Sequence, residues 1–214
     1  MRGTRHGDSG SRVERKQRTR AALLDAALRL MAQGRSFTSL GLREITREAG
    51  VVPTSFYRHF TDLDELGLAL VEDGGLTLRR LLREARRADL PAKDMIRRSV
   101  EIYRDYVDGH RLQFLFITGE RSGGSLAIRA AIRSEIDHFT HEIAQDLRGL
   151  GLFADLSSDS LRMICSLVVT TMLTAAVDFL DLPPEQARRE SELIDNFVQQ
   201  IRLIFLGAAH WRDA

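Results

Sequence analysis

Cysteine, tryptophan and long hydrophobic runs are scarce in this sequence of 214 residues, which contains one Cys and one Trp. The single Cys165 cannot form an internal disulfide, and its apolar segment MICSLVV predicts a small buried side chain. No run reaches the roughly 18 apolar residues of a membrane span, and the arginine-rich start lacks the apolar segment of a signal peptide. We therefore expect no membrane insertion, no export and a cytoplasmic location.

Alternating strand patterns and internal repeats are also absent, and the apolar residues recur at helical spacing. With 43% hydrophobic and 29% charged residues, the composition is that of a globular protein. The sequence therefore predicts an all-α fold, preceded by a mobile basic tail at 1–13. The predicted helices are 14–33, 40–49, 53–60, 63–88, 92–108, 111–119, 125–150, 161–182 and 185–209.

The net charge of +1 conceals an uneven distribution. Residues 1–62 carry twelve Lys and Arg against six Asp and Glu, whereas the remainder carries 19 basic and 24 acidic residues. A basic end on a weakly acidic body is typical of a protein that presents that end to a polyanion, although a basic disordered tail gives the same imbalance.

Two short predicted helices, 40–49 and 53–60, flank Gly50. Thr38 or Ser39 can cap the first helix, and glycine is a usual helix stop. Two helices joined by a short turn that contains glycine are typical of a helix-turn-helix, whose second helix enters the major groove of DNA. Because similar helix pairs occur in many other proteins, the basic charge of this end is what favours DNA binding.

The second of these helices separates its apolar and polar residues. Pro53 suits a first helical position, and Phe56 and Phe60 are four residues apart, so we assign both rings to the core. Val51 and Val52, just before it, are also expected to reach the core. The remaining side chains can contact phosphates or base edges, and with Arg18 on the first helix they are the candidate DNA-binding residues. They are Thr54, Ser55, Tyr57, Arg58 and His59.

The predicted helices 161–182 and 185–209 are apolar on more than one face. A helix with two apolar faces must bury both. One face can pack on the domain's own core and the other on the same helices of a second subunit, so we expect a homodimer formed through these two helices.

The segments LREITREAG, SFYRHF and DELGLALV, in this order, resemble the TetR family of transcription regulators. The resemblance implies a helix-turn-helix DNA-binding head at 14–61 and a helical ligand-binding and dimerisation domain at 62–214. It also implies a palindromic operator and adds Arg43 to the candidate DNA contacts. Further likeness in PTSFYRHF, GERSGGSLAIRAAI and FLGAAHW is to the members of the family that repress unsaturated fatty-acid synthesis and sense long-chain acyl thioesters.

That closer likeness implies a long-chain acyl-CoA effector and no catalytic cofactor. We expect Phe114, Phe116 and Ile117 to line a tunnel for the acyl chain, and Arg121 or Arg129 to meet the phosphates. The alternatives are that these aromatics form plain core and that Arg121 is a solvated loop charge. A drug, an aromatic compound or a signalling compound is the alternative effector.

The sequence departs from the family pattern at two places. Leu63 stands where the family commonly has a lysine, which removes one phosphate contact, and Thr46 stands where alanine is usual. We expect the Thr46 hydroxyl to bond back to the preceding turn.

A metalloenzyme is the alternative to a DNA-binding regulator. His138 and His141 stand three apart in the sequence, a spacing that can hold a metal, but no third ligand or catalytic motif accompanies them.

Overall fold

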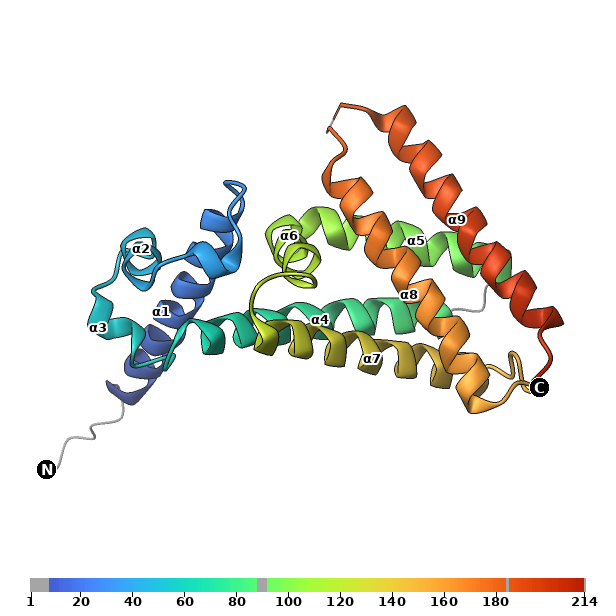
Figure 1. The fold of residues 1–214 in the computed structure, drawn as a ribbon, viewed down its shortest axis with the longest axis horizontal. Helices are drawn as coiled ribbons and strands as arrows, with labels where there is room; N and C mark the ends of the chain where they lie inside the picture. Colours follow the sequence, from blue (N-terminus) through green and yellow to red (C-terminus); the bar gives the residue numbers. More distant parts are fainter. Residues whose placement is uncertain (1–7, 88–91, 184, 214) are drawn as a thin grey trace, which may run out of the picture.

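The computed structural model describes residues 8–87, 92–183 and 185–213, and every regular element in these ranges is helical (Figure 1). The all-α prediction is confirmed. The elements are α1 (Asp8–Met31), the 3-10 helix η1 (Phe37–Ser39), α2 (Leu42–Glu48), α3 (Pro53–Phe56), α4 (Leu63–Arg87), α5 (Ala92–Gly109), α6 (Arg111–Glu120), α7 (Leu126–Gly149), α8 (Ser158–Leu180) and α9 (Ala187–His210).

The first helix begins at Asp8, so the predicted boundary between tail and helix at residue 13 is wrong. The side chains of residues 12–18 are exposed, and an exposed helical extension needs no apolar pattern to mark it. Residues 1–7 of the expected tail lie outside the described residues.

The second helix is shorter than predicted because the segment before it forms η1. Gly41 occupies the N-cap position of α2 without a side-chain cap, and the Ser39 hydroxyl instead donates to the Ser36 carbonyl at 2.7 Å. The expected caps Thr38 and Ser39 are therefore wrong. Both residues belong to η1.

The third helix ends at Phe56 rather than at Phe60. The chain nevertheless keeps turning, since the N–H of Phe60 donates to the carbonyl of Phe56 at 3.0 Å. The two rings therefore remain on one side, with centroids 5.6 Å apart, and both are buried as predicted.

Helix α4 connects the head, formed by α1, α2 and α3, to the body, formed by α5–α9, and α7 runs alongside it (Figure 1). Asp62 caps α4 by accepting a hydrogen bond from the N–H of Glu65 at 2.8 Å. One hydrophobic core spans the junction of head and body. It includes Phe37 and Phe56 of the head, Leu66 of α4, Phe116 of α6 and Ile128 of α7.

Helices α8 and α9 pack on each other at the far end of the body (Figure 1). Among the described helices, α8 is long and apolar enough to cross a membrane, with a mean hydropathy of 1.9 in its most apolar window. Half of that window is buried inside the protein, as is usual for a core helix. Cys165 lies on its inner face and is fully buried, as predicted.

Candidate nucleic-acid interface and ligand cavity

The turn between α2 and α3 depends on a glycine. Gly50 has φ +69°, a left-handed conformation that side chains with a Cβ rarely adopt. Val51 follows half-buried against the head core, whereas Val52 is 62% exposed, so the expectation that both valines reach the core is wrong for Val52. The turn between α2 and α3 is therefore anchored in the core by Val51 alone of these two valines.

Burial of Phe56 and Phe60 leaves the other side of α3 and the turn after it open to solvent. Tyr57 is 64% exposed, and its neighbours Thr54 and Arg58 are also exposed. The remaining candidate residues are Ser55 and His59, which are half-buried, and Arg43 on α2 and Arg18 on α1, which are exposed.

The acidic side chains of α2 are neutralised from neighbouring segments. Glu44 pairs with Arg35, and the hydrogen bond from that guanidinium holds the pKa of Glu44 below its ordinary value. Glu48 pairs with Arg29 at 2.8 Å. Arg43 makes no ion pair within the described part of the chain, so its positive charge is available to a phosphate.

His59 lies in a positively charged environment formed by residues of α1 and of the turn after α3. Burial lowers the pKa of its imidazole, and the charges of Lys16, Arg20 and Arg58 lower this pKa further. Its Nδ1 is buried without a hydrogen-bond partner. The early turns of α1 and the end of α3 therefore form one basic surface, as a DNA-binding head requires.

Lys16 and Arg20 belong to this basic surface although neither is among the candidate contacts. Arg20 is not fully free to reach a phosphate, because its guanidinium lies 5.4 Å from the ring centroid of Phe60 and 3.6 Å from the Asp73 carboxylate. The basic run at the start of α1 is the sequence signal for both residues.

The two departures from the family pattern have simple structural reasons. Thr46 is 1% exposed, and its hydroxyl donates to the carbonyl of Arg43 at 3.1 Å, as predicted for a bond to the preceding turn. Leu63 is half-buried and packs against the head core, so this position has a packing role.

An apolar cavity of about 110 Å³ lies among α4, α5, α6, α7 and α8. A second apolar cavity of about 70 Å³ lies beside it and is lined by residues of α4, α5, α7, α8 and α9. Tyr103 and Met172 line both cavities and stand between them. The two spaces together could accept an elongated apolar molecule if Met172, a flexible side chain, moved aside.

Of the five residues expected to contact the ligand, two line the larger cavity and three do not. Phe114 and Ile117 line the larger cavity. Phe116 lies on the other side of α6 in the head core, 5.6 Å from Phe37 between ring centroids. Arg121 is exposed and Arg129 donates to the Gly123 carbonyl, and neither of these arginines lines either of the two apolar cavities.

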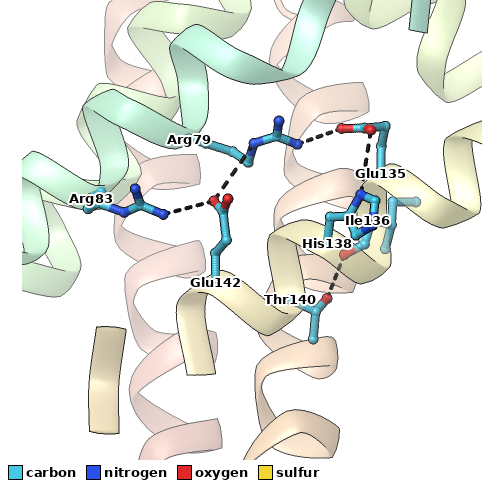
Figure 2. A network of polar contacts seen from close by, with 7 residues as sticks. All are labelled: Arg79, Arg83, Glu135, Ile136, His138, Thr140 and Glu142. Atoms are coloured by element: carbon cyan, nitrogen blue, oxygen red, sulfur yellow. Dashed lines mark hydrogen bonds and ion pairs between the residues drawn. The ribbon is translucent and has the colours of Figure 1, made fainter. Parts of the chain in front are cut away.

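Arg79 is the cation that lines the larger cavity, together with Glu135. Arg79 pairs with Glu135 and, at 3.7 Å, with Glu142 of α7, and both ion pairs are drawn in Figure 2. Arg83 continues the network at 3.2 Å from Glu142 and 3.6 Å from Asp146. These ion pairs fasten α4, the connector to the head, to α7.

The two candidate metal ligands take part in ordinary surface contacts. His138 lies 3.7 Å from Glu135 at the edge of the network in Figure 2, and His141 lies 2.9 Å from the Gln145 amide. No group of three or more His, Cys, Asp or Glu side chains that could hold a metal occurs among residues 8–87, 92–183 and 185–213.

Helix α6 contacts the ligand cavity and the head with different faces. Its residues Phe114 and Ile117 line the cavity, whereas Phe116 and Glu120 contact the head. Glu120 is 2% exposed and accepts a hydrogen bond from the N–H of Phe37 at 2.8 Å. A shift of α6 around an occupant of the cavity would therefore be transmitted to the head.

A helix-turn-helix head with a basic outer surface, joined by one long helix to a body with apolar cavities, defines a DNA-binding regulator that responds to a small molecule. Residues 23–70 match the family model described as "Bacterial regulatory proteins, tetR family", and residues 92–202 match the one described as "Tetracyclin repressor-like, C-terminal domain". The chain belongs to the TetR family of transcription regulators.

Solved structures of other transcription regulators share the fold. A regulator from Streptomyces coelicolor is 20% identical, with a TM-score of 0.65 over 92% of this chain and 84% of that chain. A regulator from Shewanella sp. PV-4 is 18% identical, with a TM-score of 0.66 over 86% and 95%. FadR from Bacillus subtilis, solved in complex with stearoyl-CoA, is 14% identical, with a TM-score of 0.64 over 86% and 96%.

Proposed function

We propose that this chain is a homodimeric repressor of fatty-acid metabolism genes, which binds a palindromic operator and changes its affinity when long-chain acyl-CoA occupies the body. The proposed response to a ligand is supported chiefly by the position of α6, which lines the larger cavity with one face and contacts the head with the other. Coupling of about 1–3 kcal/mol between two sites changes affinity roughly 5- to 150-fold, which is enough for a genetic switch.

The proposed DNA contacts are the exposed side chains of the head. Tyr57 and Thr54 would reach base edges or phosphates from α3 and the turn after it, and Arg43 would reach a phosphate from α2. The remaining proposed contacts are Ser55, Arg58, His59 and Arg18.

The proposed dimer uses the outer faces of α8 and α9. On α8, Met163, Leu167 and Val177 recur at helical spacing and are 41–52% exposed. On α9, Leu203 and Leu206 are 71% and 61% exposed. Such a stripe is costly in water, and a two-fold axis would bury it against its own copy.

Acyl-CoA is proposed because the cavities are apolar, because the sequence resembles acyl-sensing repressors, and because FadR holds stearoyl-CoA in the same fold. The acyl chain would occupy both cavities after Met172 moves. The modest volumes of about 70 and 110 Å³ also suit a smaller hydrophobic effector, such as a drug, an aromatic compound or a signalling compound, which is the second candidate.

An operator titration tests this function. The protein is bound to its operator, and oleoyl-CoA, coenzyme A or oleate is added while fluorescence anisotropy reports the bound DNA. We expect oleoyl-CoA to change operator affinity at least about 5-fold, whereas coenzyme A leaves it unchanged. An operator affinity indifferent to oleoyl-CoA and stearoyl-CoA would reject the acyl-CoA effector in favour of the second candidate.

A further inference from the structure

Tyr103 of α5 is the polar residue that the two apolar cavities share. Its side chain is 3% exposed and lines both cavities, and its hydroxyl makes no hydrogen bond to a described residue. Nearly all polar groups inside proteins have a hydrogen-bond partner, so this one is open to a partner that enters the cavities. An occupant of the cavities that accepted a hydrogen bond would supply this partner.

The hydroxyl is a donor at neutral pH. Burial raises the pKa of Tyr103 well above its ordinary value, so the proton stays on the oxygen. The side-chain amide of Gln113 lines the larger cavity from α6 and also lacks a hydrogen bond within the described part of the chain. Two hydrogen-bonding groups from different helices thus border a space that is otherwise mostly apolar.

The charged end of the larger cavity limits the kind of acceptor. Arg79 is already paired with Glu135, and both side chains line the cavity. A carboxylate placed there would meet the Glu135 carboxylate as well as the guanidinium, and like charges in a partly buried site repel strongly. An uncharged carbonyl meets no such opposition.

We propose that the effector carries an uncharged carbonyl flanked by two apolar arms, and that Tyr103 recognises this carbonyl while the arms fill the cavities on either side. The inference rests on the proposed ligand-responsive function and narrows its ligand to the class of ketones, esters and thioesters. Tyr103 is the residue that distinguishes such molecules from hydrocarbons of the same shape.

The test compares two probes that differ in one group. 5-Nonanone carries the carbonyl, and 5-methylenenonane replaces its oxygen by a CH₂ group. Their dissociation constants are measured by NMR titration of the ¹³C-labelled methyl group of Met172, which lines both cavities. Because a neutral hydrogen bond changes affinity about 3- to 10-fold, the preference for the ketone should fall by that factor in Tyr103→Phe.

Tyr106→Phe is the matched control, because Tyr106 lies on the same helix, is also buried at 6% exposed and lines neither of these cavities. This variant should keep the preference for the ketone. Tyr103→Phe should unfold at the same temperature as the wild type or higher, because its hydroxyl makes no hydrogen bond within the described chain. An unchanged preference in Tyr103→Phe, or no shift of the Met172 signal with either probe, overturns the proposal.

The outcome is distinct from that of the operator titration. A ketone preference that depends on Tyr103, together with no response to oleoyl-CoA, rejects acyl-CoA as effector but supports the carbonyl recognition. If Tyr103→Phe responds to oleoyl-CoA as the wild type does and neither protein prefers the ketone, the carbonyl recognition is rejected. The proposed acyl-CoA-responsive function is then retained.

Discussion

The carboxylate of Glu120 accepts a hydrogen bond from the backbone N–H of Phe37 at 2.8 Å, across 83 residues of sequence. Glu120 ends α6, and Phe37 begins η1 in the head. Gly123 passes so close that a Cβ there would collide with the Glu120 carboxylate. This bond and the neighbouring contact of Phe37 with Phe116 fix the head on α6.

Loss of the Glu120 carboxylate should weaken the whole junction. Glu120→Ala leaves the N–H of Phe37 buried without an acceptor, so the free energy of unfolding should fall by about 1–3 kcal/mol in urea denaturation. Glu120→Gln retains an oxygen acceptor and should cost less. Glu72→Ala removes an exposed carboxylate from α4 and is the control, with an expected change of about 0.5 kcal/mol or less. Equal losses for the Gln and Ala variants would contradict the role of the hydrogen bond.

Removal of the exposed Tyr57 ring should impair DNA binding without affecting the fold. The side chain is 64% exposed, so Tyr57→Ala should leave the unfolding temperature within a few degrees of the wild type. Operator affinity should fall about 10-fold or more in fluorescence anisotropy. Tyr57→Phe separates the contribution of the hydroxyl from that of the ring, and wild-type affinity in Tyr57→Ala would remove this residue from the interface.

Removal of the Arg43 charge should change the salt dependence of binding. A protein that contacts phosphates releases counterions, so the slope of log K against log salt should become about one unit shallower in Arg43→Ala. Arg188→Ala removes an arginine of the body that is 94% exposed, and it should leave the slope unchanged. Identical slopes for Arg43→Ala and the wild type would show that Arg43 touches no phosphate.

His59 predicts a pH dependence of stability. Because burial and nearby cations lower its folded pKa below the ordinary 6.5, the unfolded chain binds its proton more readily. The wild type should therefore lose stability as pH falls from about 6.5 toward the folded pKa, and this loss should be smaller in His59→Gln. Urea denaturation of both proteins at several pH values measures the difference. Parallel pH profiles would contradict the lowered pKa.

Much of the fold follows from the sequence because each helix has an apolar face and a local stop signal. Gly50 and Pro53 mark the turn and the start of α3 by their backbone preferences alone. The predicted length of α3 was wrong. A helix through residue 60 and the observed turn after Phe56 both place Phe56 and Phe60 on one side, so the burial pattern does not distinguish them. The predicted start of α1 was wrong because helical residues that are exposed all round show no apolar periodicity in the sequence.

The cavity was harder to predict because an apolar residue looks the same whether it lines a cavity or fills a core. Phe114 and Phe116 are two residues apart on a helix buried on both sides, and only tertiary packing separates their roles. The partner of Glu120 is a backbone N–H, which has no sequence signature. The cation of the cavity is Arg79, and its position depends on how α4 crosses α7.

Selection from a random duplex library tests the central claim most directly, because it needs neither the operator nor the effector to be known. Wild-type protein at low salt should enrich an inverted repeat whose half-sites lie about 34 Å apart or a multiple of that distance, as two heads on a two-fold axis require. The Tyr57→Ala protein should enrich it far less. A monomer that enriches no repeated sequence would contradict the account.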